Sequence, residues 1–366
     1  MSESAESRGK ALPLEEMRAL IADLDRPKPW IYWVDFLTSV TLGWGAFAAS
    51  LMLAPISVLQ IILILVSGAA LYRGLAFIHE ITHLRQDGVP GFRLAWNLLC
   101  GVPVLIPDFM YVGIHLVHHT KRGYGTGRDA EYLPFTSRSK GFLLGQVPGL
   151  LVLPMMALIR FGLLSPLSLV IPPLRQWVKE HMSAVSMKLP YKRALPSKRT
   201  DWRWWRLEET GCSVLVLGVA AGIAAGFLPV ALAVHWYLVL VTITLLNFVR
   251  AIGATHRYSG DESVMSFSEQ FDDSVNVTGS SPLTLIICPV GLRFHALHHL
   301  FPALPYHGLG AAHRRLAEAL PPDSPYAAAS VPGILAGCAQ LWRSAGTGAV
   351  LPSHAHPVDQ TGLSEA

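Results

Sequence analysis

The sequence has little charge for a chain of its length. Of its 366 residues, 15% are Asp, Glu, Lys or Arg, whereas 51% are hydrophobic and the mean hydropathy is +0.39. Soluble domains carry about 25% charged residues, so this composition excludes an ordinary soluble protein and predicts an integral membrane protein. Residues 1–29 mix acidic and basic side chains without an apolar run. We therefore expect them to be a cytoplasmic N-terminal segment and not a signal peptide.

Cysteine is scarce and dispersed. The chain has four cysteines and no C-x-x-C pair: Cys100, Cys212, Cys288 and Cys338. This spacing excludes a disulfide framework, a rubredoxin-like iron site and a zinc ribbon. The net charge of +4 arises from basic residues in loops beside apolar stretches, which membrane topology explains, so we expect no nucleic-acid partner.

Four apolar stretches are long enough to cross a membrane. They lie at about 36–54, 56–78, 211–228 and 230–249. Each approaches the ~20 residues that span a hydrocarbon core of ~30 Å at ~1.5 Å per residue. Pro55 and Pro229 mark tight turns within the two pairs. The sequence therefore predicts an all-α integral membrane protein with four transmembrane helices in two hairpins.

The distribution of basic residues predicts the orientation. The turns at Pro55 and Pro229 contain no Lys or Arg, whereas the loop from Arg175 to Arg206 contains nine. By the positive-inside rule, both termini and this loop lie in the cytoplasm. Two further apolar segments, 94–113 and 141–173, are interrupted by prolines, and we expect re-entrant or interfacial segments there. The longer one must cross zero or two times, and both options are open.

Histidine is unusually abundant and clustered. Nine of the fifteen histidines form four groups near the ends of apolar stretches: His79 and His83; His115, His118 and His119; His256; and His295, His298 and His299. Residues three and four apart share one face of a helix, so each motif can aim its imidazoles at one point. Structural histidines are the alternative, but packing so many ionisable rings together without a cation is costly. Nine imidazoles exceed one zinc site and suit two metal ions with four or five ligands each.

The order of these motifs resembles the membrane fatty acid desaturase and hydroxylase superfamily. HEITH at 79–83, HLVHH at 115–119 and HALHH at 295–299 are similar to its three histidine boxes, and His256 is similar to its further histidine. The resemblance covers residues 30–320. It implies four transmembrane helices under a cytoplasmic helical cap that carries the boxes, a non-haem centre of two Fe ions, and O2 as co-substrate.

One position departs from part of that superfamily. Ile252 stands where acyl-CoA members have an asparagine four residues before the lone histidine. The short first box, with Glu80 after its first histidine, is more similar to lipid-linked and sphingolipid-type members. A soluble acyl-CoA substrate is therefore disfavoured.

We predict from these features an oxidoreductase that introduces a double bond into a fatty acyl chain of a membrane lipid or lipid-linked substrate. A lipid or hydrocarbon hydroxylase of the same superfamily is the alternative, because the boxes do not distinguish the two reactions. A metal transporter or a haem membrane protein is a more distant alternative, since the histidines lie at the ends of the apolar stretches and not within them. Electrons must come from an external ferredoxin, rubredoxin or cytochrome b5, which we expect to dock on the basic face from Arg175 to Arg206.

Carboxylates near the boxes are expected to accept the free N–H of the ligand rings. The favoured candidates are Glu80, Asp129 and Glu131, and the others are Asp261, Asp272 and Asp273. For His307 and His313, which follow the third box, we expect structural roles. The C-terminal segment, 321–366, is expected to be disordered from about residue 346, where Gly, Pro, Ser and His follow no period.

Overall fold

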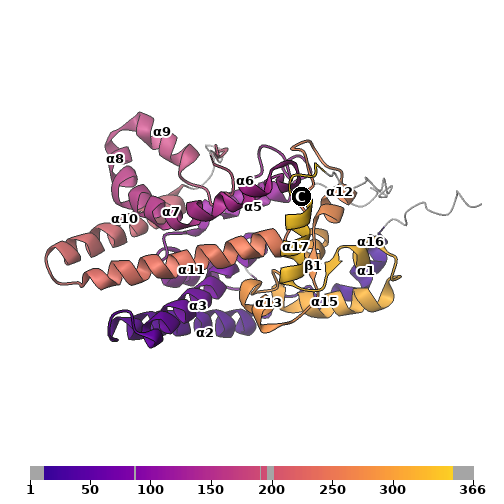
Figure 1. Cartoon of the computed structure of the whole chain (residues 1–366), viewed down its shortest axis with the longest axis horizontal. Helices are drawn as coiled ribbons and strands as arrows, with labels where there is room; N and C mark the ends of the chain where they lie inside the picture. Colours follow the sequence, from indigo (N-terminus) through magenta and orange to yellow (C-terminus); the bar gives the residue numbers. More distant parts are fainter. Residues whose placement is uncertain (1–11, 86–87, 190, 196–201, 349–366) are drawn as a thin grey trace, which may run out of the picture.

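The computed structural model describes residues 12–85, 88–189, 191–195 and 202–348. Long helices run side by side at one end, and shorter helices gather at the other (Figure 1). The described residues contain one small parallel sheet, which pairs β1 (Asn276–Val277) with β2 (Ser330–Val331). The protein is thus mostly helical with several long apolar helices, as predicted. Most of the expected disordered tail lies outside the described residues.

The first hairpin consists of α2 (Pro29–Leu51) and α3 (Val58–His83). Pro29 occupies the start of α2, where its missing N–H costs nothing, and the Ser57 hydroxyl caps α3 by accepting from the Gln60 N–H. Both helices extend toward the cap beyond the apolar stretches predicted for them, because backbone hydrogen bonding continues after the apolar side chains end. As a result, the last turns of α3 carry the first two histidines.

The second hairpin consists of α10 (Arg203–Ala224) and α11 (Val230–Ala254). Helix α11 packs against α3, and the approach is close at Gly68, where an added Cβ would meet Thr242 Cβ at 2.6 Å. At its other end α11 crosses α17 (Ile334–Ser344), where Gly337 faces the backbone of Gly253. These glycine contacts fix the end of α11 just before His256.

A fifth helical run, Lys140–Val170, is also long and apolar enough to cross a membrane. It comprises α6 (Lys140–Leu144), α7 (Gln146–Ile159), a π-helical turn, η5 (Arg160–Leu164), and α8 (Ser165–Val170). Before this run the Thr136 N–H donates to Tyr258 O, and after it the Met187 N–H donates to Ala130 O. The chain just before this run and the chain 17 residues after it therefore lie beside neighbouring loops, which fits an even number of passes. The protein has the predicted four spans if this run does not cross the membrane, and six if it crosses twice.

The other interrupted segment, 94–113, is divided into short helices. They are α4 (Phe92–Trp96), η2 (Asn97–Gly101), η3 (Asp108–Met110) and the start of α5 (Val112–His118). Arg93 Nη2 donates to Asp108 Oδ1 at 2.8 Å, and the Asn97 side chain donates to the same carboxylate. These bonds tie the segment into a compact turn that begins and ends near the histidines.

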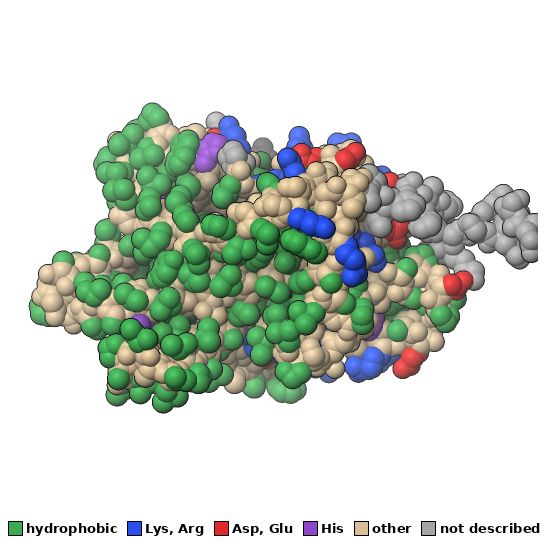
Figure 2. Space-filling view, in the orientation of Figure 1, with side chains coloured by type: hydrophobic (Ala, Val, Ile, Leu, Met, Phe, Trp, Pro, Cys, Tyr) green, Lys and Arg blue, Asp and Glu red, His purple; other side chains and the backbone are tan. Residues whose placement is uncertain are grey.

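Most of the remaining short helices form the cap. They are α1 (Leu14–Ile21), η1 (Ala22–Leu24), η4 (Phe135–Ser137), α12 (Phe267–Asp273), α13 (Pro282–Ile287), α14 (His295–Leu300), α15 (Tyr306–Ala319) and α16 (Pro325–Ala328). Helix α9 (Pro172–His181) instead packs against α8, beside the long helices (Figure 1). Figure 2 shows that hydrophobic side chains cover the long helices, whereas acidic and basic side chains gather over the cap. An apolar body with a polar end is the surface expected of a membrane protein with one large water-facing region.

Candidate metal centre

Four separate elements bring the nine predicted histidines to one place. His79 and His83 lie one turn apart at the end of α3, and His115 and His118 lie on α5. His119 ends α5. His256 follows α11 by two residues, and α14 carries the remaining three. The apolar packing of α3 and α11 therefore sets the positions of the polar cluster.

The histidines form two groups of potential metal ligands. The first group contains His79, His83, His115, His119 and His298, and the second contains His118, His256, His295 and His299. Within each group, one ring nitrogen of every member lies within 4.8 Å of all the others. The groups adjoin, because the rings of His119 and His299 stack with centroids 4.5 Å apart.

The ring nitrogens converge within each group. Nε2 of His119 lies 3.0 Å from Nε2 of His115 and 3.1 Å from Nε2 of His298. In the second group, Nε2 of His295 lies 3.1 Å from Nε2 of His256 and 3.0 Å from Nε2 of His299. Nitrogens that converge in this way can share a cation at the centre of each group.

Several of these nitrogens have no other partner. Nε2 of His79, His83 and His118 is buried, and none has a hydrogen-bond partner in the described part of the chain. Burying an imidazole nitrogen without a hydrogen-bond partner costs free energy, and a bound metal ion would offset this cost. The residues therefore fit two metal ions, one with five imidazoles and one with four.

Burial keeps most of the rings neutral. The pKa values of His115, His119, His256, His295, His298 and His299 are lowered well below 6.5. Desolvation is the main cause, and repulsion from neighbouring histidines adds to it. A neutral imidazole keeps a lone pair for a metal, so the same burial that disfavours protonation prepares the ligands.

Two predicted carboxylates contact the second motif. Asp129 Oδ2 lies 2.7 Å from Nδ1 of His118, and Glu131 Oε1 lies 2.8 Å from Nδ1 of His115. Tyr111 donates its hydroxyl to Glu131 at 3.0 Å. Burial raises the pKa of Glu131 to about 7, whereas the pKa of Asp129 is lowered because attraction to His118 and hydrogen bonds outweigh desolvation. Each carboxylate is placed to hold one tautomer, with Nδ1 protonated and Nε2 free.

Glu80 and Asp261 lie elsewhere than expected. Glu80 Oε1 is 3.9 Å from Nδ1 of His79, beyond hydrogen-bond distance, and the carboxylate instead accepts from the Tyr32 hydroxyl at 2.6 Å and the Tyr306 N–H at 3.1 Å. It therefore joins α2, α3 and α15. Asp261 accepts from the Ser263 N–H in an exposed loop.

Asp273 was one of several candidates in the sequence, and the structure places it beside the second group. The Tyr124 hydroxyl lies 2.9 Å from both Asp273 Oδ2 and Nδ1 of His256, so it links the two. Ser259 also donates to Asp273, at 2.6 Å from its hydroxyl and 2.8 Å from its N–H. Sequence reasoning missed Tyr124, because a tyrosine in the loop after HLVHH carries no spacing signal.

Three other residues have structural contacts. Nε2 of His307 accepts from the Lys28 N–H, and Nδ1 of His313 lies 2.9 Å from the Tyr326 hydroxyl. Ile252 packs in an apolar cluster with Tyr132 and Tyr258. These contacts agree with the structural roles expected for the two histidines.

Comparison with known proteins identifies the family. The family model for fatty acid desaturases matches residues 56–330. The chain belongs to the fatty acid desaturase family. A ceramide hydroxylase from Caulobacter vibrioides is 40% identical over 326 residues, which cover 89% of this chain and 92% of the relative. No solved structure matches the chain. Membership in the desaturase family confirms the resemblance inferred from the histidine boxes and makes the protein an oxidoreductase of the desaturase and hydroxylase type.

Proposed function

We propose that the protein is an O2-dependent di-iron hydroxylase that acts on the acyl chain of a ceramide-like membrane lipid. The observation that carries the proposal is the pair of histidine groups at the ends of apolar helices, in a chain 40% identical to a ceramide hydroxylase. This reading replaces the double-bond formation favoured by the sequence, because the named relative is a hydroxylase.

The overall reaction fixes what the site must receive. One C–H bond of a methylene group is replaced by C–OH, the second oxygen atom of O2 leaves as water, and two electrons and two protons are consumed. The nine histidines would hold the two iron ions, with five ligands on one and four on the other. Iron bound there supplies the activation of O2 that an unactivated C–H bond requires.

The chain's own residues determine how the ligands are presented. Asp129 and Glu131 hold the rings of His118 and His115 through Nδ1, and Tyr124 links His256 to Asp273. Of these three histidines, His115 and His118 are almost completely buried, which keeps bulk water away from the rings. A dry site with fixed ligands limits hydrolysis and oxidative side reactions.

Lipid analysis tests the reaction class. Cells that express the intact protein should contain ceramides heavier by one oxygen atom, and the added atom should carry the label when 18O2 is supplied. A product lighter by two hydrogens would instead establish desaturation. A haem Soret band without non-haem iron in the purified protein would overturn both readings.

We further propose that electrons arrive from a small acidic ferredoxin, rubredoxin or cytochrome b5 on the cytoplasmic side, where the basic loop lies. Lys192 belongs to this loop, and its side chain is 66% exposed. The change Lys192→Glu should raise the KM for the reduced donor severalfold, because exposed charges at the edge of an interface steer the encounter. Turnover with a dithionite-reduced small dye should not change. Equal effects on both assays would contradict donor docking.

The cytoplasmic orientation has its own test. The turn between α10 and α11 should lie on the opposite side of the membrane from the histidines. A cysteine introduced at Phe227, whose side chain is 85% exposed, should react with a membrane-impermeant maleimide in intact cells. Labelling only after the cells are opened would reverse the proposed orientation.

A further inference from the structure

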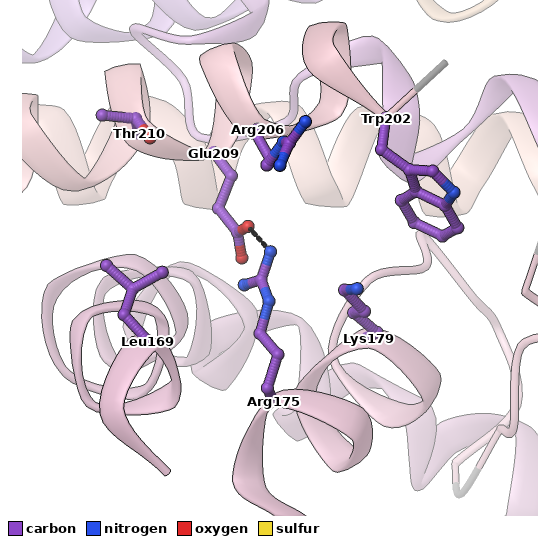
Figure 3. Close-up of a pocket in the computed structure, with 7 residues that line it drawn as sticks. All are labelled: Leu169, Arg175, Lys179, Trp202, Arg206, Glu209 and Thr210. Carbon is purple, nitrogen blue, oxygen red and sulfur yellow. Dashed lines mark ion pairs between the residues drawn. The ribbon is translucent and has the colours of Figure 1, made fainter. Parts of the chain in front are cut away.

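A basic cleft lies between α8, α9 and the first turns of α10, away from the histidines. Its volume is about 430 Å³, and seven residues line it: Leu169, Arg175, Lys179, Trp202, Arg206, Glu209 and Thr210. Figure 3 shows Arg175 rising from α9 to Glu209, with Leu169 at one end of the space and Trp202 at the other. The cleft thus has one aliphatic end, a charged middle and one aromatic end.

Positive charge in the cleft exceeds negative charge. Glu209 is the only acidic residue in the lining, and it accepts from both Arg175 at 2.6 Å and the buried Arg160 at 2.8 Å. One carboxylate therefore serves two guanidinium groups. Lys179 and Arg206 have no carboxylate partner among the residues that the structure describes.

Lys179 lies against the aromatic end of the cleft and near its other basic side chains. Lys179 Nζ lies 4.6 Å from the centre of the Trp202 ring, and the pKa of Lys179 is lowered by partial burial and by the nearby Arg175. Concentrated positive charge of this kind is unfavourable alone and becomes favourable when an anion enters. The Arg175–Glu209 pair forms the floor, since these side chains are only 18% and 6% exposed.

The surroundings of the cleft match the interface of a membrane. Leu169 and Val170, at the end of α8, are 76% and 77% exposed, and Trp177 on α9 and Trp204 on α10 are about half exposed. Exposed leucine and valine beside tryptophan and basic residues are typical of the boundary between acyl chains and headgroups. An anion that reaches the cleft from this boundary is a lipid headgroup.

We propose that this cleft binds the phosphate of an anionic phospholipid, with Lys179 and Arg206 as its main ligands and the acyl chains along Leu169. The phosphate accepts hydrogen bonds from the ammonium and guanidinium groups, as charged donors favour. The site does not depend on the proposed hydroxylation, because it shares no residue with the histidine groups.

Native mass spectrometry of the full-length protein in detergent tests this proposal. The probes are dioleoylphosphatidylglycerol, dioleoylphosphatidylcholine and inorganic phosphate. The unmodified protein should bind its first phosphatidylglycerol more tightly than phosphatidylcholine. The double variant Lys179→Gln, Arg206→Gln should weaken phosphatidylglycerol binding about tenfold or more, because it removes two charged hydrogen-bond donors.

A matched double variant controls for net charge. Arg18→Gln, Arg314→Gln removes two exposed charges from α1 and α15 and should leave the affinity for phosphatidylglycerol unchanged. Both double variants should keep the melting temperature of the unmodified protein, which shows that folding is intact. If both double variants weakened phosphatidylglycerol binding equally, net charge alone would explain the effect and the proposal would be overturned.

Two further outcomes would also overturn it. Displacement of phosphatidylglycerol by inorganic phosphate at equal concentration would show a site for free anions. Unchanged lipid affinity in Lys179→Gln, Arg206→Gln, with a raised KM for reduced ferredoxin, would assign the cleft to the electron donor.

Discussion

Asp129 and His118 form a buried pair, in which Oδ2 of the carboxylate lies 2.7 Å from Nδ1 of the ring. The Asp129 side chain is 0% exposed and the His118 side chain 1%. The backbone N–H groups of Gly125 and Glu131 also donate to this carboxylate, both at 2.9 Å. Asp129 is therefore fixed by its own loop and in turn fixes the ring, so that Nε2 of His118 points at the second histidine group.

Asp129→Asn should weaken iron binding by the second group about 10-fold to 100-fold, the range typical for the loss of such a partner. An amide can present its NH2 group to Nδ1 and so favour the wrong tautomer. Iron content by elemental analysis, measured after dialysis against a graded chelator, checks this.

The matched control is Asp261→Asn, which makes the same chemical change in an exposed loop away from the histidines. It should bind iron as tightly as the unmodified protein. If Asp129→Asn retained iron equally well, the proposed role of the carboxylate would be wrong.

His298→Ala should abolish activity while the protein still inserts in the membrane. Nε2 of His298 lies 3.1 Å from Nε2 of His119 and belongs to the first group of five. Its loss removes one ligand and leaves a cavity, but it does not alter the apolar faces of the long helices. Hydroxylated lipid and iron content should both fall, with normal protein in the membrane fraction. His181→Ala, on α9, should keep full activity, and equal loss in the two variants would contradict the assignment.

The sequence predicted the histidine cluster well because helical spacing and position beside apolar stretches are both local signals. HLVHH and HALHH needed only the helical repeat to align their rings. The roles of Glu80 and Tyr124 could not be predicted, since they depend on contacts across 226 and 132 residues, with Tyr306 and His256 respectively. The observed helix ends also differ from the predicted ones. Hydrophobicity marks where a helix meets lipid and not where its backbone hydrogen bonds stop.

The stability of the metal-free protein should fall as the pH drops below about 6.5. The pKa values of six histidines are lowered well below 6.5 in the folded protein: His115, His119, His256, His295, His298 and His299. The unfolded chain therefore binds more protons in this window, and each such proton contributes about 1.4 kcal/mol per pH unit toward unfolding.

Glu131 and His118 have the opposite effect, but the six histidines outnumber them. Burial raises the pKa of Glu131 to about 7, so its contribution is present below its ordinary value of 4.5 and is lost as the pH rises through 7. The pKa of His118 is raised because attraction to Asp129 outweighs desolvation, so its contribution is present below 6.5. Melting temperatures of the apoprotein in detergent, followed by circular dichroism from about pH 7.5 to about pH 5.5, should decline on acidification. A constant or rising melting temperature would show that the histidines are not buried in neutral form.

Gly337→Ala should destabilise the protein by about 1–3 kcal/mol, the usual cost of overpacking. An added Cβ would lie 1.9 Å from Gly253 O, and backbone atoms cannot rotate away as a side chain can. Helix α17 must then move off the end of α11, which also displaces His256. Gly218→Ala on α10 is the matched control, because a Cβ there meets nothing within 4 Å. Thermal unfolding should show a lower melting temperature for Gly337→Ala alone, with weaker iron retention. If Gly337→Ala melted at the same temperature as Gly218→Ala, the contact between α17 and α11 would be looser than these distances require.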